Sequence, residues 1–106
     1  MKTKEELNEI LYNIPAVPKF ITKEWLEGAY SKGMIPKKDL QVDKYYYGEC
    51  RNSSVAMWDG KKFLYMRSKF GSSFVDDVEC CEDEIGFDVF IPVSEIEPDP
   101  HKVIKR

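Results

Sequence analysis

An aspartate–glycine pair, Asp59-Gly60, constrains this 106-residue chain more than any other feature. It separates two strand-like runs, SSVAMW and KKFLYMR. Both residues tolerate the positive φ that a tight two-residue turn requires. We therefore predict a β-hairpin with strands at 54–58 and 61–67, and we expect the rest of the fold to assemble around it.

This turn also sets a register and sorts the hairpin side chains onto two faces. If Asp59 and Gly60 form the whole loop, Trp58 lies opposite Lys61, and Asn52 lies opposite Arg67. One face is then apolar and is predicted to belong to the core, with Met57, Val55, Leu64 and Met66. The other face mixes aromatic rings with hydroxyl, amide and guanidinium groups. A three-residue loop with a glycine bulge would shift this register and scramble the division into two faces.

Helical patterns precede the hairpin. Thr3 and Glu6 fit the S/T-x-x-E capping box, and apolar residues then recur at positions 7, 10, 11 and 14. This helix ends before Pro15, because proline disfavours helical geometry in the residue before it. A second short helix is predicted from its cap at Thr22 to about Tyr30.

Further strands are predicted on both sides of the hairpin. The aromatic run 45–47 favours a strand, and Gly48 after it indicates a bulge or a close backbone approach. A turn around Gly71 over 68–73 leads to a strand at 74–78. A final strand ends at Pro92, which suggests a sheet edge and leaves a homodimer through that edge as an expectation.

These elements predict one α+β domain over residues 1–106. Two short N-terminal helices would pack on an antiparallel sheet of about four strands with the hairpin at its centre. The helical part spans 1–33, the sheet part spans 44–92, and we expect the tail, 98–106, to be frayed.

Composition limits the setting and the chemistry. Three cysteines, an odd number, argue against a disulfide framework, and no apolar run approaches the ~20 residues of a membrane helix. The first residues are too charged for a signal peptide, so we expect a cytoplasmic protein. Cys80 and Cys81 lack the spacing of zinc ligands, and the single histidine, His101, leaves no nucleophile–base pair to propose. We therefore predict no metal, no cofactor and no enzymatic activity.

Hydrogen-bond donors and aromatic rings gather along the hairpin. Arginine can bind phosphate through two parallel hydrogen bonds, and an aromatic ring can stack on a nucleobase. The first hypothesis is a non-enzymatic binding protein that holds an anionic nucleotide-like ligand on this face. Its predicted ligand-binding residues are Arg51, Asn52, Ser54, Trp58, Tyr65, Arg67 and Lys69. In the competing interpretation the aromatic side chains pack under the helices and Arg67 pairs with an acidic loop.

Charge is distributed unevenly along the chain. Residues 75–99 carry ten carboxylates and no lysine or arginine. Such a segment can present a phosphate-like surface to a basic groove. The alternative hypothesis is a protein–protein inhibitor whose segment 76–88 occupies a basic, nucleic-acid-binding site on a partner. Its predicted partner-binding residues are Asp76, Asp77, Glu79, Glu82, Asp83 and Glu84. In the competing interpretation the segment is solvated and offsets cations of the same molecule.

The run YYxGxCRNxxxAxWDGxxFxYxRxKFGxxF, followed by EDxxGFDVFxP, resembles small, largely uncharacterised proteins associated with bacteriophages and prophages. The resemblance covers residues 45–92 and leaves out the helical N-terminus. It implies a cytoplasmic accessory protein and transfers no catalytic role. By analogy it favours an inhibitor or sequestering protein of the anti-defence type over an enzyme.

Overall fold

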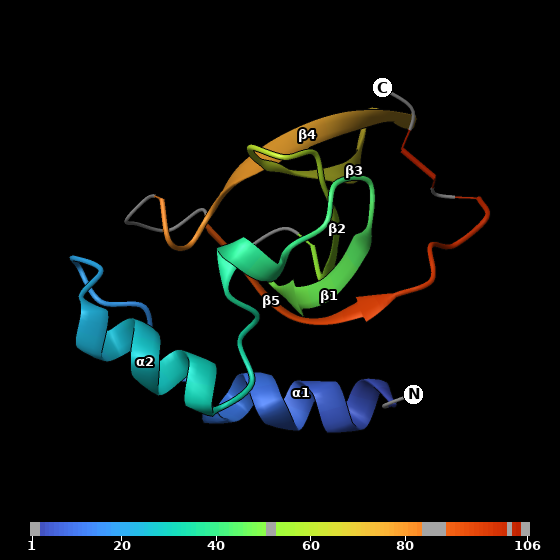
Figure 1. The fold of residues 1–106 in the computed structure, drawn as a ribbon. Coiled ribbons are helices and arrows are strands. Elements are labelled where there is room, and N and C mark those ends of the chain that lie inside the picture. Colours follow the sequence, from blue (N-terminus) through green and yellow to red (C-terminus); the bar gives the residue numbers. More distant parts are fainter. Residues whose placement is uncertain (1–2, 51–52, 84–88, 102, 105–106) are drawn as a thin grey trace.

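Five strands close into a barrel, and two α-helices pack against its outside, in a computed structural model of the chain (Figure 1). The structure describes residues 3–50, 53–83, 89–101 and 103–104. In chain order the elements are α1 (Lys4–Asn13), α2 (Lys23–Ser31), the 3-10 helix η1 (Lys37–Asp39), β1 (Tyr45–Glu49), β2 (Val55–Trp58), β3 (Phe63–Lys69), β4 (Ser72–Cys80) and β5 (Val89–Ile96).

The strand order confirms the α+β class and corrects the predicted sheet, which has five strands rather than about four. β1 to β4 follow one another as antiparallel neighbours. β5 then closes the barrel, because it pairs antiparallel to β1 and parallel to β4. The pairing of β5 with β1 joins distant parts of the chain, such as Tyr45 and Ile96, and local sequence patterns do not encode such a contact.

Both helices begin at the predicted threonine caps. The Thr3 Oγ1 accepts a hydrogen bond from the Glu6 amide at 3.2 Å, and the Thr22 Oγ1 accepts one from the Trp25 amide at 3.1 Å. Each cap satisfies an amide that the first helical turn leaves without a partner. The helix starts are therefore encoded locally, as predicted.

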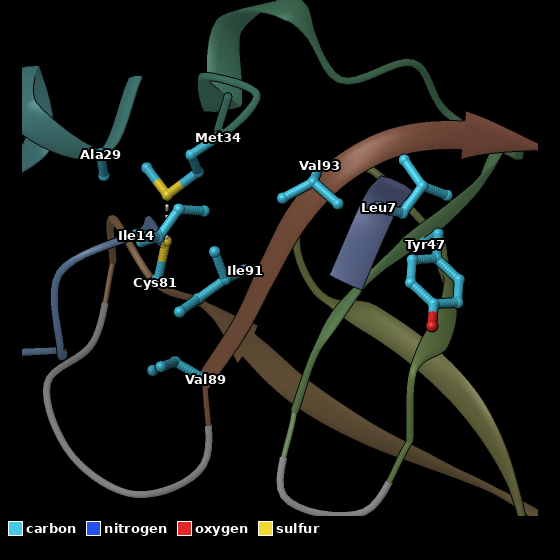
Figure 2. Close-up of a cluster of buried hydrophobic side chains, with 9 residues drawn as sticks. All are labelled: Leu7, Ile14, Ala29, Met34, Tyr47, Cys81, Val89, Ile91 and Val93. Atoms are coloured by element: carbon cyan, nitrogen blue, oxygen red, sulfur yellow. Dashed lines mark hydrogen bonds between the residues drawn. The ribbon is translucent and has the colours of Figure 1, made fainter. Parts of the chain in front are cut away.

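The helices cover the outer face of β1 and β5 with an apolar layer. Figure 2 shows this layer, whose buried members are Leu7, Ile14, Ala29, Met34, Tyr47, Cys81, Val89, Ile91 and Val93. The sulfur atoms of Met34 and Cys81 lie 3.4 Å apart within it. This packing fixes the helices to one side of the barrel (Figure 1).

The central hairpin forms, but its loop is longer than predicted. Trp58 pairs with Phe63 rather than with Lys61, so the predicted register is wrong by two positions. The Asp59 side chain provides the reason, because its Oδ1 accepts hydrogen bonds at 2.7 Å from the amides of both Lys61 and Lys62. A carboxylate that caps two loop amides stabilises a four-residue loop.

A shift by two positions keeps every side chain on its predicted face, but the structure changes what the faces do. The mixed aromatic face lines the barrel interior, where ring centroids lie 4.8 Å apart for Trp58 and Phe63 and 4.6 Å apart for Phe63 and Phe90. The face predicted to be core, with Met57, lies outside the barrel in a separate apolar cluster. Closure of a barrel encloses one face of every strand, and here it encloses the rings.

One described residue of the tail 98–106, which was predicted to be frayed, is packed against the barrel. Ile104 is buried beside Tyr45 and Met57 on the outer face of the barrel. Its amide donates a hydrogen bond to the Tyr45 hydroxyl at 2.6 Å. The prediction is wrong at this position because the outer face of β1 and β2 offers an apolar surface that Ile104 covers.

β5 is not the edge strand that Pro92 suggested. It pairs with β1 as far as Ile96, and Pro92 is fully buried opposite Gly48. The register shifts between Tyr47 and Gly48, and a Cβ on Gly48 would lie only 2.1 Å from the Ile91 carbonyl oxygen. The predicted bulge at Gly48 is confirmed, and it accommodates a proline within the sheet.

Candidate functional site

The β3–β4 hairpin extends out of the packed barrel as an arm formed by residues 67–75. Residues 67–73 are all exposed, whereas Tyr65 on β3 and Val78 on β4 are buried. Arg67 pairs with Phe74 and Lys69 pairs with Ser72, which leaves a two-residue turn at the tip. The arm therefore presents most of its side chains directly to solvent.

One face of the arm continues the interior face of the barrel, because side chains alternate along a strand. Phe63 and Tyr65 point inward, so Arg67 and its cross-strand neighbour Phe74 lie on the same side, beyond the packed interior. The Arg67 guanidinium carbon lies 5.8 Å from the Phe74 ring centroid. This places a cation over an aromatic ring at the base of the arm.

Arg67 is also held by an ion pair. Its Nη1 donates a hydrogen bond to the Asp76 Oδ2 at 2.8 Å, and the pKa of Asp76 is lowered mainly by this hydrogen bond. The arginine side chain nevertheless remains 42% exposed. Asp76 therefore orients the guanidinium while leaving part of it accessible to a ligand.

The tip of the arm has an unusual residue for its backbone geometry. Phe70 and Gly71 form the turn with φ values of 52° and 81°. Two successive positive φ values define a type I′ turn, in which asparagine and glycine are preferred. Phe70 is 96% exposed, and the Lys69 Nζ lies 5.7 Å from its ring centroid. The turn thus holds an aromatic ring in solvent beside a cation.

Two residues predicted to stack on a ligand lie inside the barrel. Trp58 is 4% exposed and Tyr65 is 3% exposed, and both pack in the interior cluster. Neither ring offers a face to a ligand in this arrangement. Barrel closure is again the cause, since it buries the face on which these rings were predicted to be accessible.

The remaining predicted ligand-binding residues are placed differently. Arg67 and Lys69 lie together on the arm, and Ser54 is exposed at the start of β2. Arg51 and Asn52 lie outside the described residues. The structure therefore brings two of the predicted cations together and associates them with rings that were not predicted, Phe70 and Phe74.

A local signal for Phe70 was present in the sequence. The predicted turn around Gly71 is confirmed. Phe70 directly precedes this glycine, with Lys69 before the pair and two serines after it. A large apolar residue at the centre of a polar turn has no core position to occupy. Turn position, rather than periodicity, therefore predicts an exposed ring here.

Cations of the same chain bind four of the five described carboxylates of segment 76–83. The ion pairs, with nitrogen–oxygen distances, are Arg67–Asp76 (2.8 Å), Lys62–Asp77 (3.7 Å), Lys62–Glu79 (3.3 Å) and Lys37–Asp83 (2.5 Å). Glu82 accepts hydrogen bonds from the Tyr30 hydroxyl and the Lys37 amide, whereas Glu84 lies outside the described residues. This part of the acidic segment therefore offsets cations within the molecule.

Comparisons of the chain with protein-family models, curated proteins and solved structures gave no match. In the described ranges, no group of three or more histidine, cysteine, aspartate or glutamate side chains could hold a metal ion. The same part of the chain contains no helix that is long and apolar enough to cross a membrane.

Proposed function

We propose that this chain is a non-enzymatic binding protein whose β3–β4 arm holds an anionic, nucleotide-like ligand. The observation that carries the proposal is the pairing of two cations with two rings on one short hairpin, Arg67 with Phe74 and Lys69 with Phe70. Phosphate groups would bind the guanidinium and the ammonium, and a base would stack on a ring. The arm provides both kinds of contact within a few residues.

Local charge supports an anionic ligand although the chain as a whole has a net charge of −3. Segment 67–75 contains two cations, three serine hydroxyls and no carboxylate. Arg67 is partly neutralised by Asp76, whereas Lys69 forms no ion pair with any residue that the structure describes. Lys69 would therefore supply attraction, and the oriented Arg67 would supply fixed donors.

The alternative, an inhibitor that presents its acidic segment to a basic partner, draws less support. A partner would have to displace Lys37, Lys62 and Arg67 from carboxylates that they already bind. These exposed pairs contribute little stability, so displacement is not prohibitive. A ligand that binds Lys69 does not have to displace a carboxylate of the described residues from it. This favours the arm over the acidic segment as the binding site.

Isothermal titration calorimetry with ATP and with tripolyphosphate tests the proposal. We expect ATP to bind more tightly than tripolyphosphate, because the two share a three-phosphate chain and only ATP has a base to stack. Arg67→Ala and Lys69→Ala should weaken both ligands, while the matched control Lys23→Ala, on α2, should not. No heat with either ligand, or equal affinities in wild type and both arm variants, would contradict the proposal.

A further inference from the structure

Phe70 is the arm residue that folding explains least. Its φ of 52° is unfavourable for any residue with a Cβ atom, and asparagine or glycine would occupy the same turn more easily. Its ring is almost fully exposed, so burial does not compensate for that conformation. A local rule broken without a packing gain is typical of a functional position.

The surroundings of Phe70 indicate the chemistry of its ligand. The Lys69 Nζ lies 5.7 Å from the ring centroid, and the three serines of the arm add exposed hydroxyl donors. No carboxylate lies within segment 67–75 to repel an anion. A planar ring beside a cation and hydroxyls matches a base attached to a phosphate backbone.

The shape of the arm favours a polymer over a free nucleotide. Sites for small ligands are concave and surround most of the ligand. Residues 67–73 are instead all exposed and form the projecting end of a hairpin. Arg67 and Lys69 stand two positions apart on β3, about 7 Å along the strand, so one extended chain can contact both.

We infer that the arm binds single-stranded nucleic acid, with a base stacked on Phe70 and the backbone phosphates on Arg67 and Lys69. This inference rests on the proposed function of the arm. A single strand fits better than a duplex, because an unpaired base exposes the face that an aromatic ring needs. Sequence preference is not expected, since stacking accepts every base.

Fluorescence anisotropy with a labelled oligothymidylate of about ten nucleotides measures this binding. Phe70→Ala should weaken binding by about tenfold or more, and Phe70→Trp should restore it. Phe70→Leu should remain weak, because it keeps an apolar group but loses the aromatic face. Phe20→Ala removes another exposed phenylalanine, 64% exposed, and should leave the affinity unchanged.

Salt dependence tests the phosphate contacts separately. For two neutralised phosphates on a single strand, the logarithm of the binding constant should fall against the logarithm of salt concentration with a slope of about −1.4. Lys69→Ala should reduce that slope to about −0.7. An unchanged slope in Lys69→Ala would contradict its phosphate contact.

The results for ATP and for the oligonucleotide, taken together, distinguish this inference from the proposed function on which it rests. Retained oligonucleotide affinity in Phe70→Leu, or equal affinity for a duplex of the same length, would overturn the inference. Binding to phosphatidylserine vesicles in place of the oligonucleotide would also overturn it. If ATP binding depends on Lys69 while the oligonucleotide does not bind, the proposed function stands and only the inference fails. If neither ligand binds, both fail.

Discussion

β3 begins at one phenylalanine and ends against another, and the two have opposite environments. Phe63 is 0% exposed and packs between the rings of Trp58 and Phe90. Phe70, at the far end of the strand, is almost entirely exposed. Full burial of such a side chain stabilises a fold by about 1.5–3 kcal/mol. Folding therefore explains the first ring, whereas the second needs another explanation.

The turns beside these two residues differ in the same way. At the Phe63 end, Asp59 caps the amides of Lys61 and Lys62, so the loop chemistry agrees with the fold. At the other end, Phe70 occupies a left-handed position that suits asparagine. The turn at the Phe63 end is stabilised by its own aspartate. The turn at the other end holds an exposed phenylalanine in a backbone conformation that costs stability.

The largest effect is expected from removing the buried ring. Phe63→Ala should lower the free energy of unfolding by about 3–5 kcal/mol, because it leaves a cavity where the Trp58 and Phe90 rings now contact Phe63. Urea denaturation measures this loss. Phe63→Leu, which keeps most of the volume, should lose much less. A loss below about 1 kcal/mol for Phe63→Ala would mean that the barrel interior is not packed as described.

The Asp59 cap should have an intermediate effect. Asp59→Ala leaves two loop amides without their acceptor and should lower the free energy of unfolding by about 1 kcal/mol. Asp59→Asn retains an acceptor oxygen and serves as the control, with a smaller loss. Equal stability of Asp59→Ala and wild type would remove the cap as the reason for the four-residue loop.

Replacing the exposed ring of Phe70 should stabilise the protein, in contrast to the two preceding substitutions. Phe70→Asn places a residue that tolerates positive φ in the turn, so it should raise the free energy of unfolding by up to about 1 kcal/mol. The same variant should lose oligothymidylate binding. Phe20→Asn, at an exposed phenylalanine without positive φ, should not stabilise the protein. A destabilised Phe70→Asn variant would show that the ring supports the fold after all.

The smallest effect concerns the ion pair at the base of the arm. The pKa of Asp76 is lowered from 3.8 in the folded protein, so its ion pair stabilises the fold above about pH 4. This contribution is lost as the pH falls through the folded pKa. Asp76→Asn should therefore lose slightly less stability than wild type between pH 5 and pH 2 in acid denaturation curves. Equal losses of stability in wild type and Asp76→Asn over this pH range would contradict a stabilising Arg67–Asp76 ion pair.

Local patterns predicted the elements, and long-range pairing decided how they assemble. The caps at Thr3 and Thr22 and the bulge at Gly48 were predictable because each depends on neighbouring residues. Closure depends on pairing of β5 with both β1 and β4, and no local pattern encodes it. Since closure determines which face is enclosed, the positions of Trp58 and Tyr65 could not be read from the hairpin alone.

The candidate site shows the same limit. Lys69 and Arg67 were predicted as ligand-binding residues because they are cations near the end of a predicted hairpin strand and can bind phosphate. The ring beside Lys69 was not predicted, because exposed residues follow no periodic pattern and the strand alternation favoured the rings that are buried. The only local signal for its exposure is the turn around Gly71, in which the pairing of Lys69 with Ser72 places Phe70.

An NMR titration of ¹⁵N-labelled protein with an oligothymidylate of about ten nucleotides tests the arm most directly as the binding site. We predict that amide shift changes concentrate in residues 67–75 and leave the amides of α1 unchanged. The Phe70→Leu variant should show much smaller changes at the same concentrations. Shift changes centred on the helices, or no changes in the arm, would contradict the assignment of binding to the β3–β4 hairpin.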